Sequence, residues 1–151
     1  MRLTRRAALK GVLAGAVGAV AGTAAYLIGW REGDPAAHVL MRWTGATDAF
    51  LRSRNAIDPY IEALAVRPDL QSIGIGTAML AEAERRTLQR GFTTIALAVG
   101  VDNDGARRLY DRLGYRDAGL GDFRATWTAI DREGRETTQG ETVTYMRKYL
   151  R

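Results

Sequence analysis

Residues that usually build disulfides or metal centres are almost absent from this chain of 151 residues. There is no cysteine, which excludes a disulfide framework and a thiolate metal site. The single histidine, His38, cannot form a zinc site by itself, so no metal is expected. No repeat or low-complexity linker divides the sequence. The length therefore corresponds to one domain, and a hydrophobic content of 46% is sufficient for a packed core.

A basic face of the kind that binds nucleic acid is also lacking. The net charge is +5, but four basic residues near the N-terminus supply +4 of it, and the charges of the remaining chain nearly balance. A nucleic-acid footprint should instead cover one face of the folded domain. The high pI therefore gives no reason to expect a nucleic-acid partner. The four residues are Arg2, Arg5, Arg6 and Lys10.

The first thirty residues allow two interpretations. Gly11 to Trp30 contains no charged residue and is long enough to span a bilayer. The preceding segment, Thr4 to Lys10, resembles a twin-arginine export signal, and Ala19-Val20-Ala21 fits a cleavage site. A membrane-tethered or exported protein is therefore one alternative.

The composition of the same segment favours a different interpretation. Eleven of the twenty residues from Gly11 to Trp30 are Ala or Gly, so the run is only weakly hydrophobic. Its last part, from Ala25, is also needed as a strand. We therefore expect residues 1–24 to form an atypical N-terminal segment, a small-residue helix that packs on a sheet, and residues 25–151 to form the domain itself.

The apolar pattern then predicts a series of strands. Tyr26 to Trp30 and Ala37 to Trp43 flank a turn and read as a hairpin. After a polar connection with one helical turn near residues 48–52, Tyr60 to Val66 reads as a buried strand that ends before a proline. The helical spacing that follows continues to Arg90 and stops at Gly91.

The turn between that strand and that helix, Gln71 to Thr77, is suited to binding an anion. Its glycines, Gly74 and Gly76, stand where the helix begins. The first N–H groups of a helix have no partner within it and carry the positive end of its dipole. Glycines let an anion approach them closely, so a pyrophosphate fits such a site. The alternative is a turn that needs glycine only for its backbone dihedrals.

A second stretch repeats the order of strand, turn and helix. Thr93 to Val99 is another apolar strand, and Asn103 to Tyr115 holds a short helix that Gly114 closes. A closing hairpin follows, with strands at Phe123 to Ile130 and Thr142 to Tyr149. In it Trp127 and Tyr145 are placed to line a cleft, although packing roles are expected of both.

The motifs "V-x-P-x-x-Q-x-x-G-x-G" and "N-x-x-A-x-x-L-Y-x-x-L-G-Y", in this order and at this separation, closely resemble the GNAT superfamily of acyl-CoA-dependent N-acyltransferases. The resemblance extends from about Ala25 to Ala118. It implies an α/β fold with a mixed, mainly antiparallel sheet flanked by helices. Only about 24 residues precede the strand at Ala25, so the first strand and first helices of the family are expected to be missing or replaced.

The resemblance also implies acetyl-CoA as the donor. In the family the strand before the glycine turn splays from its neighbour and holds the pantetheine and thioester carbonyl, while the turn holds the pyrophosphate. Asn103 matches a family asparagine on the pantetheine arm, or it serves as a helix N-cap. Ile73 departs from the family, where a polar or basic residue is more common. The implied cofactor-binding residues are Leu64, Ala65, Val66, Gln71, Ser72, Ile73, Gly74, Ile75, Gly76, Thr77 and Asn103.

Two residues carry the implied chemistry. Tyr110 matches the tyrosine that acts as general acid on the thiolate, with core packing as the alternative. Some relatives carry a base on the strand before the second motif, but this chain has Ala98 there. Glu62, four residues before Val66, matches the base of other relatives and is therefore the expected base, acting through a water. Strand alternation puts Glu62 on the same face as Leu64 and Val66, so its side chain is expected to reach the cleft. The alternative for Glu62 is a structural salt bridge. His38 is expected to be structural.

The function that follows is transfer of an acetyl group to a primary amine of a small molecule or peptide, by direct attack in a ternary complex. A cytoplasmic location agrees with acyl-CoA as the donor, a membrane partner is not expected, and a homodimer is compatible with the sequence. The short N-terminal region leaves a second alternative, a degenerate protein that binds acyl-CoA without turnover. The sequence does not identify the acceptor.

Overall fold

The computed structural model describes residues 13–20 and 24–151. Their strands are β1 (Leu13–Val20), β2 (Ala24–Arg31), β3 (Asp34–Arg42), β4 (Tyr60–Val66), β5 (Thr94–Gly100), β6 (Arg116–Asp117), β7 (Phe123–Ile130) and β8 (Glu136–Tyr149). Their helices are α2 (Ala49–Ser53), the 3-10 turn η1 (Pro68–Leu70), α3 (Ile75–Gln89) and α4 (Asp104–Arg112).

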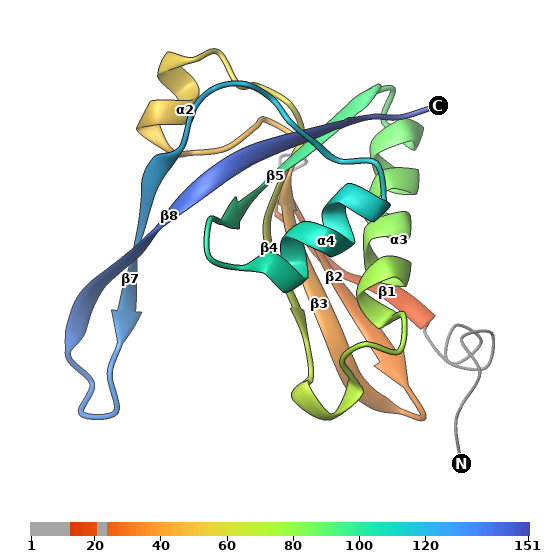
Figure 1. Cartoon of the computed structure of the whole chain (residues 1–151). Helices are drawn as coiled ribbons and strands as arrows, with labels where there is room; N and C mark the ends of the chain where they lie inside the picture. The colour runs from red at the N-terminus through yellow and green to blue at the C-terminus, as the bar shows by residue number, and fades with distance from the viewer. Residues whose placement is uncertain (1–12, 21–23) are drawn as a thin grey trace.

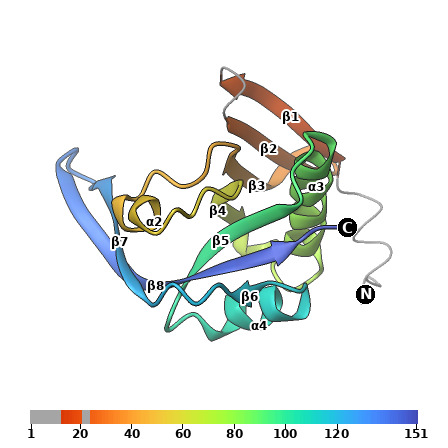
Figure 2. The same cartoon turned by 90° about the horizontal axis from the view of Figure 1, so that it is seen from above.

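One curled sheet organises the described residues, with the strand order β1-β2-β3-β4-β5-β8-β6, while β7 pairs with β8 (Figures 1 and 2). Every neighbouring pair is antiparallel except β4 and β5, which run parallel. The expected mixed, mainly antiparallel sheet is therefore confirmed.

Helices cover both faces of the sheet, and the sheet separates two hydrophobic cores. On one face α3 buries Ile75, Met79 and Leu80 against Val39 and other residues of the central strands. On the other face α2 buries Leu51. This second core contains Ala46, Leu51, Ala56, Ala96, Phe123, Val143 and Tyr145. The sheet thus lies between the two cores, and side chains on one face are separated from those on the other face by the strands.

Turn chemistry explains where the elements end. Between β2 and β3, Glu32 and Gly33 both have positive φ, 52° and 89°, as a two-residue hairpin turn of the primed type requires. Gly91 and Gly114, with φ of 84° and 95°, follow α3 and α4. Left-handed glycine is the usual end of a helix. The strand at Tyr60–Val66 and the helix stop at Gly91 agree with the sequence pattern.

The helix expected over residues 1–24 is wrong for the part of that segment which is described. Leu13–Val20 is a strand, β1, antiparallel to β2 with Leu13 opposite Trp30. The larger apolar residues Leu13, Val17 and Val20 stand at helical spacing, but the other five of the eight residues are Ala or Gly, and the free edge of β2 supplies backbone partners. Pairing with a neighbour, rather than local pattern, therefore decides the state of this segment.

The export-signal interpretation rests mainly on Thr4 to Lys10, which lie outside the described residues. Among the residues that are described, none of the helices is both long and apolar enough to cross a membrane.

The last strands form a long hairpin that extends away from the helices (Figure 1). β8 begins at Glu136, six residues before the start expected from the sequence, and pairs first with β7 and then with β5. Trp127 on β7 is 43% exposed, so the packing role expected of it is not observed.

Candidate active site

The two parallel strands separate at the centre of the sheet. β4 and β5 are paired only at Tyr60 with Ala96 and at Ile61 with Leu97. On its other side β4 stays paired with β3 as far as Val66. The segment from Glu62 to Val66 therefore presents one unpaired backbone edge toward the space that opens beside β5. This is the splay that the resemblance implies.

The N-terminus of α3 faces this opening. Gly74 is the N-cap, with φ of 96°, and no side chain caps the helix. The first turn also contains no acidic residue. The side-chain amide of Gln71 donates to the carbonyl of Val66 at 3.2 Å and ties the turn to the end of β4. The free N–H groups and the positive end of the dipole thus remain available to an anion.

The other two α-helices that the structure describes, α2 and α4, have capped N-termini. At α2 the Asp48 carboxylate accepts from the N–H groups of Phe50 and Leu51. At α4 the Asn103 side chain accepts from the N–H of Ala106 at 3.1 Å. Two termini are satisfied within the protein, and the one beside the splayed strand is not.

A cleft of about 650 Å³ lies between α3 and α4. One side, which we call the glycine wall, consists of Leu64, Val66, Gln71, Ser72, Gly74, Gly76 and Thr77. The opposite side, which we call the α4 wall, consists of Asn103, Gly105, Ala106, Arg108, Leu109 and Arg112. The walls meet where a Cβ placed on Gly76 would lie 3.8 Å from Leu109 and 3.7 Å from Val66.

Eight of the eleven expected cofactor-binding residues line this cleft. The side chains of the other three lie elsewhere. Ala65 lines a cavity on the other face of the sheet, Ile73 packs against the core, and Ile75 is buried in it. Their expected contribution was a backbone N–H or carbonyl, and that contribution stays a prediction. Asn103 both caps α4 and lines the cleft.

The sequence pattern did not indicate the arginines of the α4 wall as binding residues. Gly105, Arg108, Leu109 and Arg112 follow one another at helical spacing, so they share one face of α4. The spacing can be read from the sequence, but the sequence does not show which face of the helix meets the cleft.

Tyr110 does not line the cleft. It lies half-buried on α4 against the core beneath α3, and its ring contacts Tyr115 edge-on at 5.9 Å. Burial raises the pKa of Tyr110 above its ordinary value. The next residue toward the N-terminus, Leu109, lines the cleft. The packing role is therefore observed, and the role as acid stays a prediction.

Glu62 lies at the apex of the splay, one residue beyond the last pair with β5. Its carboxylate accepts from Arg42 Nε at 2.8 Å. Arg42 follows the buried Met41, which belongs to the core under α3, so the ion pair lies on the other face of the sheet.

The sequence argument that put Glu62 on the same face as Leu64 and Val66 is therefore wrong. Leu40 pairs with Ala63 but Met41 pairs with Ile61, which leaves Glu62 as an extra residue in a β-bulge. A bulge breaks the strict alternation of side chains on which that argument relied. The salt bridge weighed as the alternative is present.

The sequence model of the Acetyltransferase (GNAT) family matches residues 6–115. The chain belongs to the GNAT family of acetyltransferases. The family resemblance is thereby confirmed. Two uncharacterized N-acetyltransferases of Methanocaldococcus jannaschii are 40% and 42% identical to it over 57 and 67 residues. The matches cover 38% and 40% of this chain and 25% and 40% of those relatives, so the chain spans less than half the length of each.

Solved GNAT structures share the fold. The IAA acetyltransferase from Bacillus cereus has a TM-score of 0.64 at 14% identity, with 92% of this chain and 99% of that chain covered. A GNAT family acetyltransferase from Elizabethkingia anophelis, solved with acetyl-CoA bound, also has a TM-score of 0.64, at 10% identity. There the coverage is 93% of this chain and 99% of that chain. At these identities the likeness shows the fold alone.

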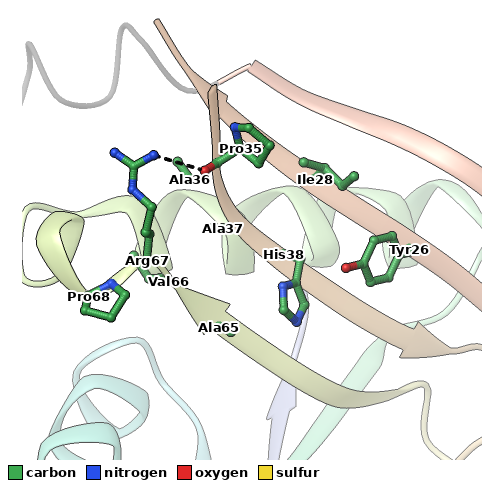
Figure 3. A pocket seen from close by; sticks show the side chains of 10 residues that line it. All are labelled: Tyr26, Ile28, Pro35, Ala36, Ala37, His38, Ala65, Val66, Arg67 and Pro68. Atoms are coloured by element: carbon green, nitrogen blue, oxygen red, sulfur yellow. Dashed lines mark hydrogen bonds between the residues drawn. The ribbon is translucent and has the colours of Figure 1, made fainter. Parts of the chain in front are cut away.

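A second, smaller cavity of about 330 Å³ lies on the opposite face of this GNAT sheet (Figure 3). Tyr26 and His38, from neighbouring strands, stack there with ring centroids 5.5 Å apart. Arg67 stands at its edge, where its guanidinium donates to the Pro35 carbonyl at 3.5 Å. His38 thus takes part in packing, which agrees with the structural role expected of it.

Below the second core, a buried carboxylate fixes β8. Asp58 accepts from the Tyr145 hydroxyl and from Arg147 Nε, both at 2.9 Å. Tyr145 is 1% exposed and stacks on Tyr60, so its expected packing role is confirmed. Burial and the charges of Asp48 and Glu62 raise the pKa of Tyr60 to about 12. This cluster holds the sheet together but does not line the cleft.

Proposed function

We propose that this GNAT protein is an N-acetyltransferase that moves the acetyl group of acetyl-CoA to a primary amine of a small molecule or peptide, by direct attack in a ternary complex. The observation that carries the proposal is the uncapped N-terminus of α3, which opens on the cleft beside the free backbone edge of β4 and opposite the α4 wall.

The residues present fit acetyl-CoA. A Cβ placed on Gly74 would meet no atom within 4 Å, and the φ of this glycine is 96°, so the backbone there is accessible to a phosphate. The glycine wall contains no carboxylate that would repel the anion. When bound, acetyl-CoA supplies an activated acyl group as a thioester. Gln71 to Thr77 would hold its pyrophosphate, and Leu64 to Val66 together with Asn103 its pantetheine arm.

Acyl transfer requires three things of the protein. The attacking amine must lose a proton, the thioester carbonyl oxygen must be stabilised as it gains charge, and the departing sulfur must receive a proton. We assign the first task to Glu62 through a water, because it is the carboxylate at the apex of the splay. Unpaired backbone groups of β4 serve the second. Tyr110 serves the third, since a tyrosine hydroxyl is protonated at neutral pH and can donate its proton to the sulfur.

A second candidate function is binding of acyl-CoA without turnover. Two observations favour it: the Glu62 carboxylate is already engaged by Arg42, and Tyr110 is absent from the cleft lining. Neither observation concerns the phosphate site. This candidate therefore binds acyl-CoA in the same cleft as the proposed enzyme and differs only in lacking acetyl transfer.

Acetylation screened by mass spectrometry against amine and peptide libraries separates the two candidates. We expect a mass increase of one acetyl group on at least one amine, dependent on acetyl-CoA and absent with a folded Gly76→Glu variant. Calorimetric binding of acetyl-CoA with no product across a broad panel would instead support the second candidate. Absence of both binding and product would contradict the proposal altogether.

A further inference from the structure

The positive side chains of the cleft all lie on one wall. Arg108 and Arg112 stand one helical turn apart on α4, and both line the cleft. The glycine wall contains only uncharged residues. Ile73, at the turn itself, packs against the core and carries no charge. The cationic contribution to ligand binding must therefore come from α4.

Neither of these two arginines forms an ion pair within the part of the chain that the structure describes. The adjacent Arg107 differs: it is directed to another side of α4, where its Nε lies 3.8 Å from Asp111. An exposed arginine with no partner in a cleft is suited to a phosphate, which its planar fork can bind through two hydrogen bonds.

CoA offers two kinds of phosphate. The pyrophosphate would receive the neutral N–H groups of the glycine wall, which need no side-chain cation. The 3′-phosphate is a monoester, and a phosphate monoester carries a charge of about −1.5 to −2 at pH 7. It is therefore the group with the greatest need for paired guanidinium charge.

We propose that Arg108 and Arg112 bind the 3′-phosphate of CoA and make this enzyme select CoA over carriers that lack this group. This inference rests on the proposed function, because it assumes that CoA occupies the cleft.

Calorimetric titration with CoA and with 3′-dephospho-CoA tests the assignment. The wild-type chain should bind CoA roughly tenfold more tightly than dephospho-CoA, since charge-assisted hydrogen bonds to the phosphate are lost with it. Arg108→Gln and Arg112→Gln should each weaken CoA severalfold and leave dephospho-CoA within about twofold, so the discrimination shrinks. Arg107→Gln, on the same helix but paired with Asp111, is the matched control and should retain the wild-type discrimination.

Other outcomes overturn the assignment in distinguishable ways. If both arginine variants fold and keep the wild-type preference for CoA, the 3′-phosphate is held elsewhere although the proposed function stands. An equal loss for both ligands would instead place the arginines on the pyrophosphate. If the wild-type chain binds neither ligand, the proposed function fails together with this inference. Melting temperatures of all variants establish that the comparison is made between folded proteins.

Discussion

The two walls of the cleft are built by different means. The glycine wall offers backbone: an uncapped helix terminus, a left-handed glycine and the free edge of β4. The α4 wall offers side chains, since its own helix terminus is occupied by Asn103 and its first turn contains Asp104. Backbone donors are neutral and fixed in position, whereas guanidinium groups are charged and mobile. The first wall is thus suited to place a ligand, and the second to select it by charge.

The largest effect on activity is expected from Tyr110, a residue of α4 that does not line the cleft. Replacing Tyr110 with Phe keeps the ring against Tyr115 and removes only the hydroxyl. If this hydroxyl protonates the departing sulfur, kcat should fall on the order of 10² to 10⁴ with little change in melting temperature.

Tyr115→Phe is the matched control for that variant. Its hydroxyl donates to Glu84 Oε1 at 3.0 Å, away from the cleft, so the variant should lose some stability and keep its kcat. Full activity in Tyr110→Phe would show that α4 contributes binding but no chemistry.

On the glycine wall the largest effect is expected at Gly76. A glutamate there brings a carboxylate and bulk to the phosphate site, and the affinity for acetyl-CoA should fall on the order of 100-fold by calorimetry. Gly76→Ala is the control, because its Cβ would make only ordinary contacts with Val66 and Leu109 at 3.7 and 3.8 Å. Unchanged affinity in a folded Gly76→Glu variant would remove the phosphate from this wall.

Glu62 belongs to neither wall and should therefore affect chemistry without binding. Glu62→Gln keeps the shape and removes the charge; we expect normal acetyl-CoA affinity and kcat/KM about tenfold lower at neutral pH. The deficit should shrink as pH rises, because the amine then loses its proton unaided. Stability should change little, since the pair with Arg42 is partly exposed. A wild-type pH profile would rule Glu62 out as the base.

The smallest effect on the cleft is expected from Asp58, which is remote from both walls. Burial alone would raise the pKa of Asp58, but hydrogen bonds from Arg147, Thr94 and Tyr145 outweigh it and lower the pKa below 3.8. The carboxylate therefore stabilises the fold at neutral pH, and this contribution is lost as pH falls through the lowered value.

Asp58→Asn should accordingly cost about 1–3 kcal/mol in urea unfolding at pH 7, with acetyl-CoA affinity unchanged. The gap to the wild type should narrow as pH falls below 3.8, because the carboxylate of the unfolded chain takes up a proton there, and should close below the lowered pKa of the native carboxylate. A gap that does not depend on pH would show that Asp58 stabilises by packing rather than by charge.

What the sequence predicts of the fold is what local chemistry determines. The β4 strand, the glycine turn and the stop at Gly91 follow from apolar runs and from residues with special backbone freedom. The β1 strand does not, because the helical spacing of Leu13, Val17 and Val20 among Ala and Gly residues favours a helix, whereas pairing with β2 makes it a strand. The two-residue strand β6 exists only through its pairing with β8.

The residues of the candidate site also differ in whether local sequence predicts their role. The glycine wall could be predicted, because two glycines in one turn indicate that its backbone binds the ligand. The arginines of the α4 wall could not be assigned without knowing which face of the helix meets the cleft. The face expected for Glu62 was wrong because a bulge depends on how β3 and β4 align, which no local pattern around that residue encodes.

Amide hydrogen exchange, followed by mass spectrometry with and without acetyl-CoA, tests the central claim most directly. If the cleft between the two walls is the acetyl-CoA site, peptides that contain Ser72 to Thr77 and Asn103 to Arg112 should become protected together. Peptides of β2 and β3, around Tyr26 and His38, should exchange as before. Protection confined to β2 and β3, or no protection at saturating acetyl-CoA, would contradict the account.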